Sequence, residues 1–201
     1  MLKNTDMTSD ELRSLLGVIR DKDRAIGLIS GELVISEPSL WFLKNGIIHF
    51  TVTSNGLTVQ EETICSNGKK ILVSRCVQGI KFRVTEGVKY PIVVIPSSFW
   101  LKDNERLTGN IFAEAKTRRW TMPKIEVGYL IRQMFTDQQI RQMGFGSIIT
   151  MHESIEDYDG IHGFLGTNPG DNPGLSMYFG TKPHSRWGID HGFAFSEEAG
   201  K

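Results

Sequence analysis

Cysteine is scarce in this sequence, with only Cys65 and Cys76 among 201 residues. The two flank Asn67-Gly68, a dipeptide typical of a two-residue hairpin turn. Pairing across that turn places Cys65 opposite about residue 70 and Cys76 opposite about residue 59. Because a disulfide requires Cα atoms within about 7 Å, we expect two free thiols and a reducing, cytoplasmic environment.

Long hydrophobic runs and familiar enzyme motifs are also missing. No stretch approaches the roughly 18 apolar residues of a membrane span, and the first residues lack the apolar core of a signal peptide. There is no Gly-x-Gly-x-x-Gly or Walker loop, no Gly-x-Ser-x-Gly elbow and no Cys-x-x-Cys pair. We therefore expect no membrane partner, no cofactor and no metal, while the absence of these motifs does not exclude an enzyme.

Net charge is zero, because 23 basic side chains balance 23 acidic ones, but the charges are unevenly distributed. Residues 1–68 carry 6 basic and 9 acidic side chains, residues 69–141 carry 14 and 6, and residues 142–201 carry 3 and 8. A basic middle segment could form one phosphate-binding surface. Alternatively, the three segments neutralise one another across the folded protein.

Length and a hydrophobic content of 39% suit a single globular domain over residues 1–201. Near the start, Thr8 and Glu11 fit a capping box ahead of apolar residues at helical spacing, which predicts a helix over residues 8–20. From about residue 25 to 95 the pattern is that of short strands joined by tight turns. The β-rich runs are Leu40–Leu43, Ile47–Thr53, Leu57–Ile64, Ile71–Val77, Ile80–Thr85 and Val88–Ile95. With Asn-Gly pairs at 45–46, 55–56 and 67–68, they predict an antiparallel β-meander.

Residues 96–201 mix helix, strand and loop signals. Phe99–Arg106 predicts a short helical turn, and Ile111–Trp120 fits either helix or strand. Helical spacing from Val127 to Phe135 is followed by Thr136 as the N-cap of a second short helix that ends at Gly144. Strand-like stretches are Ser147–Ile155, Leu175–Phe179 and Trp187–Phe195. The sequence thus predicts an α+β fold: a β-meander packed with a few helices, and a loop-rich C-terminal region closing on a final strand.

Two His-x-Ser/Thr tripeptides, each on a predicted strand, form the sharpest chemical pattern. They pair His49 with Thr51 and His152 with Ser154. Residues at i and i+2 share a strand face, so two such pairs facing one cleft can hold a phosphate between a general base and a general acid. The pattern resembles the 2H phosphoesterase superfamily, which is named for two such motifs at the centre of a bilobal α/β fold. The resemblance implies that His49, Thr51, His152 and Ser154 are catalytic.

A water-facing sheet surface is the alternative for His49. A hairpin at Asn55-Gly56 puts His49, Thr51 and Thr53 on one face with Thr58, Gln60 and Glu62, as on the solvated side of an antiparallel sheet.

Residues 152–162 leave a similar choice open. They hold two imidazoles and several carboxylates, which suit a divalent cation, or they form an acidic turn after a strand.

Two further clusters are candidate binding sites. The first follows a loop-rich stretch and comprises His184, Arg186, Trp187, Asp190 and His191. Its alternative is a closing strand with Trp187 in the core. The second lies in the basic segment, where Lys116, Arg118, Arg119 and Trp120 put cations beside an aromatic ring, a combination that suits nucleic acid.

Three functions remain open. The leading hypothesis is an accessory, inhibitor or immunity-type module that binds a protein partner without catalysis. The alternatives are a phosphoesterase that acts on a nucleotide or RNA phosphate through His49 and His152, and a nucleic-acid binder that uses the basic middle segment. The phosphoesterase requires imidazoles within about 5–8 Å of each other. The nucleic-acid binder requires its cations to form one patch.

Overall fold

The computed structural model describes residues 40–57, 72–77, 80, 82–168 and 174–197. All of these belong to Leu40–Lys201, one of the two units into which the chain divides, the other being Met1–Ser39. Several predicted features therefore lie outside the described residues: the helix over 8–20, the residues Thr58 to Ile64, the Asn67-Gly68 turn and Cys65. The prediction of a single domain stays a prediction.

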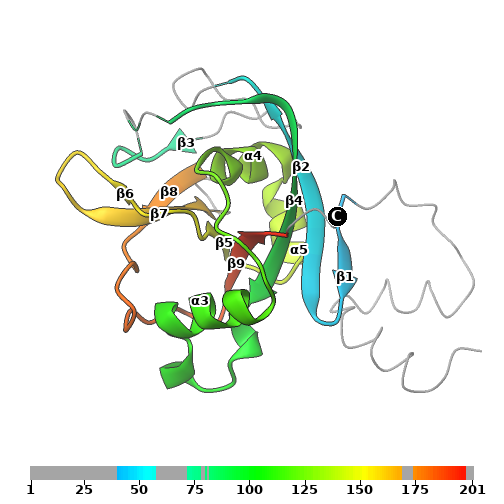
Figure 1. The fold of residues 1–201 in the computed structure, drawn as a ribbon, viewed down its shortest axis with the longest axis vertical. Helices are drawn as coiled ribbons and strands as arrows, with labels where there is room; N and C mark the ends of the chain where they lie inside the picture. The colour runs from blue at the N-terminus through cyan, green and yellow to red at the C-terminus, as the bar shows by residue number, and fades with distance from the viewer. Residues whose placement is uncertain (1–39, 58–71, 78–79, 81, 169–173, 198–201) are drawn as a thin grey trace, which may run out of the picture. The chain divides into compact units, whose positions relative to one another are not determined.

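A mixed, mostly antiparallel sheet organises the described unit (Figure 1). Its strands are β1 (Phe42–Lys44), β2 (Ile47–Asn55), β3 (Leu72–Val73), β4 (Glu86–Pro96), β5 (Ser147–Thr150), β6 (Ile155–Glu156), β7 (His162–Asn168), β8 (Gly174–Tyr178) and β9 (His191–Ser196). The order across the sheet is β1-β2-β4-β9-β5-β7-β8-β3, and β6 pairs with β7. The pairs β5–β9 and β3–β8 are parallel, and the other pairs are antiparallel.

Within the described residues, three α-helices accompany the sheet: α3 (Thr108–Thr117), α4 (Glu126–Met134) and α5 (Asp137–Gln142). Short 3-10 turns at Ser97–Phe99 and Asp103–Glu105 precede α3 and correspond to the predicted helical turn. The Thr136 hydroxyl accepts a hydrogen bond from the Gln139 backbone N–H, and Gly144, at φ +89°, follows the end of α5. The predicted α+β class is confirmed.

The meander has a more complex topology than the sequence suggested. The strands β1, β2 and β4 are antiparallel neighbours, and Asn45 and Gly46 make the tight turn between the first two at φ 51° and 76°. However, β3 pairs with β8 at the opposite edge of the sheet. Residues 82–85 run into β4 without forming a strand of their own. The strand predicted over Ser147–Ile155 is shorter in the structure, where β5 ends at Thr150.

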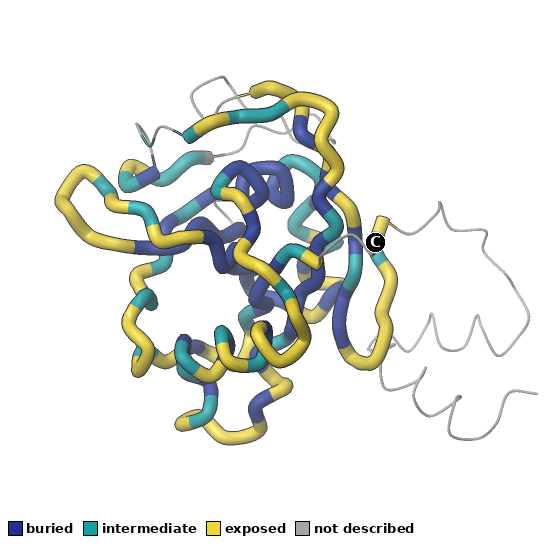
Figure 2. Tube along the Cα trace, in the orientation of Figure 1, coloured by how far each residue is buried: buried dark blue, intermediate teal, exposed yellow. Residues whose placement is uncertain are grey.

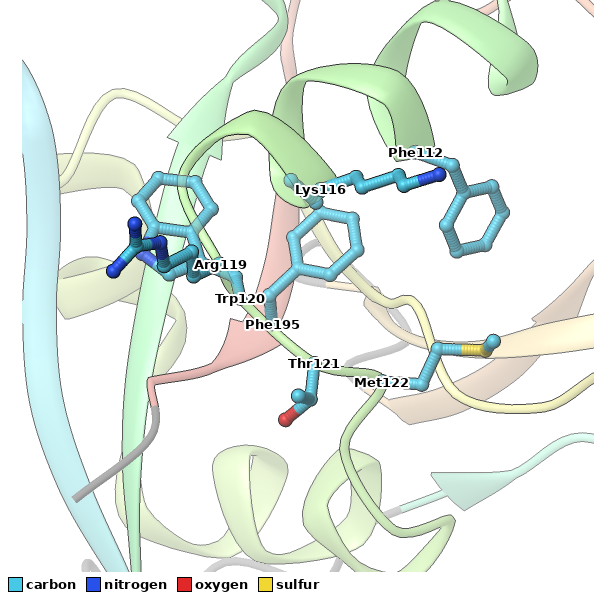
Figure 3. A pocket seen from close by; sticks show the side chains of 8 residues that line it. Phe112, Lys116, Arg119, Trp120, Thr121, Met122 and Phe195 are labelled. Atoms are coloured by element: carbon cyan, nitrogen blue, oxygen red, sulfur yellow. The ribbon is translucent and has the colours of Figure 1, made fainter.

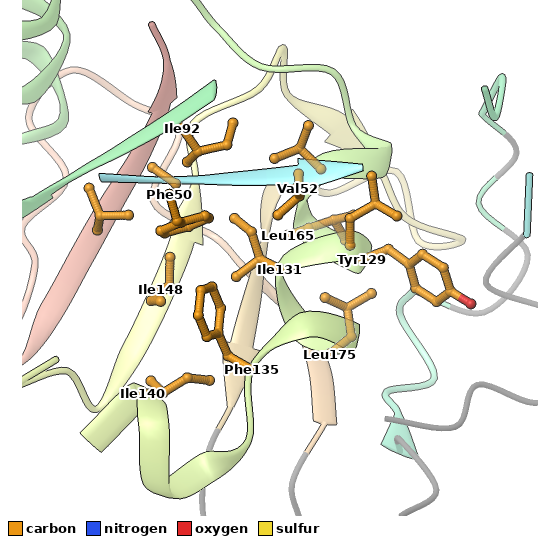
Figure 4. Packing of buried hydrophobic residues seen from close by; sticks show 14 of the residues in the cluster. Phe50, Val52, Ile92, Tyr129, Ile131, Phe135, Ile140, Ile148, Leu165 and Leu175 are labelled. Atoms are coloured by element: carbon orange, nitrogen blue, oxygen red, sulfur yellow. The ribbon is translucent and has the colours of Figure 1, made fainter. Parts of the chain in front are cut away.

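Both faces of the central strands are buried (Figure 2). Along β4, Ile92 and Val94 belong to the core on the α4 and α5 side, whereas Val93 and Ile95 belong to the core that contains Ile111 of α3. Figure 4 shows the first of these cores, in which the rings of Phe50 and Phe135 meet edge to face at 4.8 Å. This two-sided burial fixes α3 against the sheet. Among the described helices, none is long and apolar enough to span a membrane.

Candidate binding pocket beside helix α3

The end of α3 is built by two backbone hydrogen bonds. The Trp120 N–H bonds to the Ala115 carbonyl at 2.9 Å, and the Arg119 N–H bonds to the Lys116 carbonyl at 3.1 Å. This is the Schellman pattern, in which the residue after the helix adopts a left-handed conformation and is usually glycine. Arg119 occupies that position at φ 61°. A side chain there costs about 1 kcal/mol relative to glycine, so Arg119 introduces backbone strain.

The next residues are joined to the centre of the sheet. Thr121 and Ser196, at the end of β9, exchange both backbone hydrogen bonds at 2.9 Å. The Phe195 ring, from β9, therefore lies between two rings of the α3 region: Phe112 at 5.9 Å, edge to face, and Trp120 at 6.2 Å, nearly parallel. These three aromatic side chains come from three segments and form a continuous apolar floor.

A pocket of about 570 Å³ lies over this floor (Figure 3). Its lining residues are Phe112, Ala115, Lys116, Arg119, Trp120, Thr121, Met122 and Phe195. Apolar walls with a few polar groups are typical of ligand sites, which usually measure about 300–1,000 Å³. In the view of Figure 3, the Lys116 ammonium and the Arg119 guanidinium lie on either side of the Phe195 ring.

The two lining cations differ from their neighbour Arg118. Among the residues that the structure describes, neither Lys116 nor Arg119 has an acidic partner, and both are exposed. Arg118 instead pairs with the Glu114 carboxylate at 2.6 Å and lies over the rings of Phe99 and Trp120. Of the predicted residues in this segment, Arg119 and Trp120 thus line the pocket, whereas Arg118 packs against the Trp120 ring.

The chemistry of the pocket favours binding. The described residues that line it include no His, Cys, Asp or Glu, so they offer no carboxylate or imidazole base for proton transfer. It offers two cations beside an apolar surface. Such an arrangement can hold a ligand that joins a negatively charged group to an aromatic or long aliphatic group.

His49 of the predicted catalytic set lies on the polar face of β2. Along this strand Ile48, Phe50 and Val52 are buried, while Thr51 and Thr53 are exposed, which is the alternation of a solvated face. The His49 Nδ1 lies 3.4 Å from the Glu197 carboxylate, and its ring stacks on Phe42 at 5.0 Å.

His152 has a different role. It is fully buried, its Nε2 accepts the Leu165 N–H at 2.8 Å, and its Nδ1 lies 2.6 Å from the Glu153 carbonyl. Burial lowers the pKa of His152 to about 4, so the ring is neutral at pH 7 with its proton on Nδ1. Both ring nitrogens thus have hydrogen-bond partners. The bond from the β7 backbone to Nε2 continues the contact between β5 and β7 just beyond the end of β5.

The structure does not bring the two histidines together. His49 is on β2, and His152 follows the end of β5. Because β4 and β9 lie between these two strands, and neighbouring strands are about 4.8 Å apart, β2 and β5 are separated by about 14 Å. Ser154 is exposed in the segment before β6. The arrangement therefore lacks the convergence that the phosphoesterase hypothesis requires.

The second predicted binding cluster is divided between core and surface. Trp187 is buried, and its indole N–H donates to the Thr108 hydroxyl at 2.9 Å. His191 packs against Trp187 and Tyr178 with its Nδ1 3.9 Å from the Asp190 carboxylate, and burial lowers the pKa of His191. His184 and Arg186 are exposed. These residues do not line the pocket beside α3.

The acidic segment 152–162 forms a turn. The Asp157 carboxylate accepts the N–H groups of Asp159 and Ile161, both at 2.9 Å, which orders the connection between β6 and β7. Among the described residues, no group of three or more His, Cys, Asp or Glu side chains is arranged to hold a metal ion.

Sequence reasoning missed five pocket residues: Phe112, Ala115, Thr121, Met122 and Phe195. Phe112 stands one helical turn before Lys116, so a firm helix assignment would have placed both on one face. Met122 and Phe195 reach the pocket only through the pairing of Thr121 with Ser196. Comparison of the chain with protein-family models, curated proteins and solved structures finds no match.

Proposed function

We propose that the protein is a non-catalytic interaction module and that the pocket beside α3 binds a segment of a protein partner. The observation that carries this proposal is a pair of exposed cations, Lys116 and Arg119, that have no acidic partner in the described part of the chain and lie beside an aromatic floor. We further propose a cytoplasmic setting. Cys76 supports it, because this residue is a free thiol.

The strained backbone of Arg119 strengthens the argument. Unfavourable conformations persist at sites where a side chain is needed for a task other than stability. A glycine at this position would relieve the strain but remove the guanidinium. A guanidinium that is free of internal partners is well suited to a carboxylate, which it can contact through two hydrogen bonds.

A protein partner accounts for the pocket better than nucleic acid does. Several cations of the basic middle segment are used inside the fold: Arg106 and Arg132 are buried, and Arg118 pairs with Glu114. Arg75 lies over the Tyr158 ring, away from α3. Lys69, Lys70 and Lys81 lie outside the described residues. The pocket has two cations and an apolar floor. This suits a peptide that anchors one side chain beside an acidic residue better than it suits the long phosphate backbone of a nucleic acid.

Selection from a random peptide library displayed on phage tests the proposal, with the full chain as the immobilised target. We expect enriched peptides to carry Asp or Glu within about two residues of an aromatic or long aliphatic side chain. Their dissociation constants, measured by fluorescence anisotropy, should rise at least about tenfold for Arg119→Gly and rise with salt. Lys116→Gln should weaken binding in the same direction.

Arg141→Gln is the matched control, because Arg141 is an exposed arginine in the last turn of another helix, α5. This variant should bind the peptides like the unaltered protein. Enriched peptides without an acidic residue, or affinities that Arg119→Gly leaves unchanged, would contradict the proposal. Tighter binding of a single-stranded oligonucleotide at the same residues would replace it with the nucleic-acid function.

A further inference from the structure

The turn between β6 and β7 is an ordered, exposed projection (Figures 1 and 2). Besides the two hydrogen bonds to the Asp157 carboxylate, the backbone of Asp157 bonds to both Ile161 and Gly160, at 3.0 and 3.1 Å. Gly160, at φ 79°, supplies the left-handed position that the turn needs. A segment that is already ordered loses little conformational entropy when it binds.

This turn displays an aromatic side chain beside negative charge. Tyr158 is 63% exposed and Ile161 is 48% exposed. The neighbouring Asp159 carboxylate places negative charge beside the exposed ring and raises the pKa of the Tyr158 phenol. The Arg75 guanidinium lies over this ring, 5.6 Å from its centroid.

The turn and the pocket have complementary chemistry. The pocket can hold an apolar group joined to an acid, and the turn presents Tyr158 next to Asp159, with Glu156 nearby. In Figure 1 the turn lies apart from α3, so this complementarity is not used within one molecule. Two different surfaces of the same chain that match each other are suited to a head-to-tail contact between copies.

We infer that the segment bound by the pocket is the β6–β7 turn of a second copy of this chain, with Tyr158 over the aromatic floor and Asp159 facing Lys116 and Arg119. This inference rests on the proposed function of the pocket. Each molecule would then offer one turn and one pocket, so association would grow head to tail with concentration unless a ring closes.

Sedimentation velocity of the full chain over a concentration series tests this inference. The unaltered protein should associate, and added salt should weaken the association. Tyr158→Ala removes the anchor, and Arg119→Glu reverses the charge of the pocket. Each variant alone should associate at least about tenfold more weakly. Both positions are exposed, so neither substitution disturbs the core.

Mixing the two variants gives the decisive measurement. Tyr158→Ala keeps an intact pocket and Arg119→Glu keeps an intact turn, so together they can form one contact and no more. We expect a one-to-one complex that does not grow further. Ile189→Ala, a change at another exposed apolar residue, should associate like the unaltered protein.

An unaltered protein that stays monomeric at the highest concentration reached would overturn the inference, as would a mixture that forms no complex. Variants that associate as well as the unaltered protein would overturn it too. Peptide binding separates this failure from failure of the proposed function. If the chain is monomeric but its pocket still selects acidic, aromatic peptides, the pocket is a binding site for a different protein.

Discussion

Arg106 and Arg119 stand just before and just after the same helix, α3, yet their guanidinium groups have opposite surroundings. Arg106 is 5% exposed, donates to the carbonyls of Trp100 and Trp187, and pairs with Asp103. Arg119 is exposed, strained in its backbone, and without an acidic partner among the described residues. Where this fold uses an arginine for stability, it supplies carbonyl and carboxylate partners.

This contrast distinguishes a structural cation from one that we propose to be functional. A partnered, buried cation is costly to remove, because its partners are left without hydrogen bonds. An unpartnered cation in a strained conformation contributes little to the free energy of folding, so it is a candidate for another task. Five substitutions test the distinction, from the largest expected effect to the smallest.

Replacing the buried cation should have the largest effect. Arg106→Met leaves the carbonyls of Trp100 and Trp187 without this donor, and we expect the free energy of unfolding to fall by about 3 kcal/mol. Urea denaturation of the variant and of the Arg141→Met control measures the difference. A loss below about 1 kcal/mol would show that Arg106 is not a structural cation.

His152 extends the comparison to a basic group that is buried without charge. Its pKa is about 4 in the folded protein and about 6.5 in the unfolded chain, so the unfolded chain binds more protons as the pH falls. The stability that neutral His152 contributes is therefore complete above about pH 6.5 and is lost as the pH falls through about 4. This loss amounts to about 3 kcal/mol.

Urea denaturation at several pH values measures this dependence. The difference in unfolding free energy between the unaltered protein and His152→Gln should shrink by about that amount on going from pH 7 to pH 4. Because the difference between the two proteins cancels the carboxylates that both share, it reports on His152 itself. A difference that does not change with pH would mean that the ring is not buried in neutral form.

Arg118 stands between the two extremes, because its partners are only partly buried. Arg118→Gln removes the pair with Glu114 and the contact with the Trp120 ring, and should cost about 0.5–1 kcal/mol. Thermal unfolding followed by circular dichroism measures it. If Arg118 only braces the tryptophan, selected peptides should bind the variant within about threefold of the unaltered protein.

Replacing the two cations that line the pocket should cost the least stability. At one of the two positions, the substitution should even raise the free energy of unfolding. Arg119→Gly should raise the free energy of unfolding by about 0.5–1 kcal/mol, since glycine fits the left-handed position. Lys116→Gln should change it by less than about 0.5 kcal/mol. If Arg119→Gly both lowers the free energy of unfolding and abolishes peptide binding, Arg119 is a structural residue like Arg106, and the distinction between them is wrong.

Local features of the fold could be predicted from the sequence. The cap at Thr136, the end of α5 at Gly144 and the turn at Asn45 and Gly46 follow from short-range preferences, and the structure confirms them. The position of β3 beside β8 could not be predicted, because a parallel pair between distant segments leaves no local pattern. The same holds for β9, which pairs with β4 on one side and β5 on the other.

The candidate site shows the same division. Sequence reasoning selected Arg119 and Trp120 because cations beside an aromatic ring are visible in the chain. It did not separate Arg119, in the left-handed turn, from Arg118, which pairs with Glu114 and lies over the rings of Phe99 and Trp120. It also selected His152, whose burial and bond to the Leu165 N–H depend on the pairing of β5 with β7.

The central place of β9 has a consequence for how the chain reaches this structure during synthesis. β4 and β5 both find a partner in β9, although β9 follows every other strand in the sequence. While the ribosome is still translating the earlier strands, the edges of β4 and β5 that β9 will cover are therefore open to pairing with other chains. Nascent chains that stall before residue 191 should depend on chaperones, whereas release of β9 completes both halves of the sheet at once.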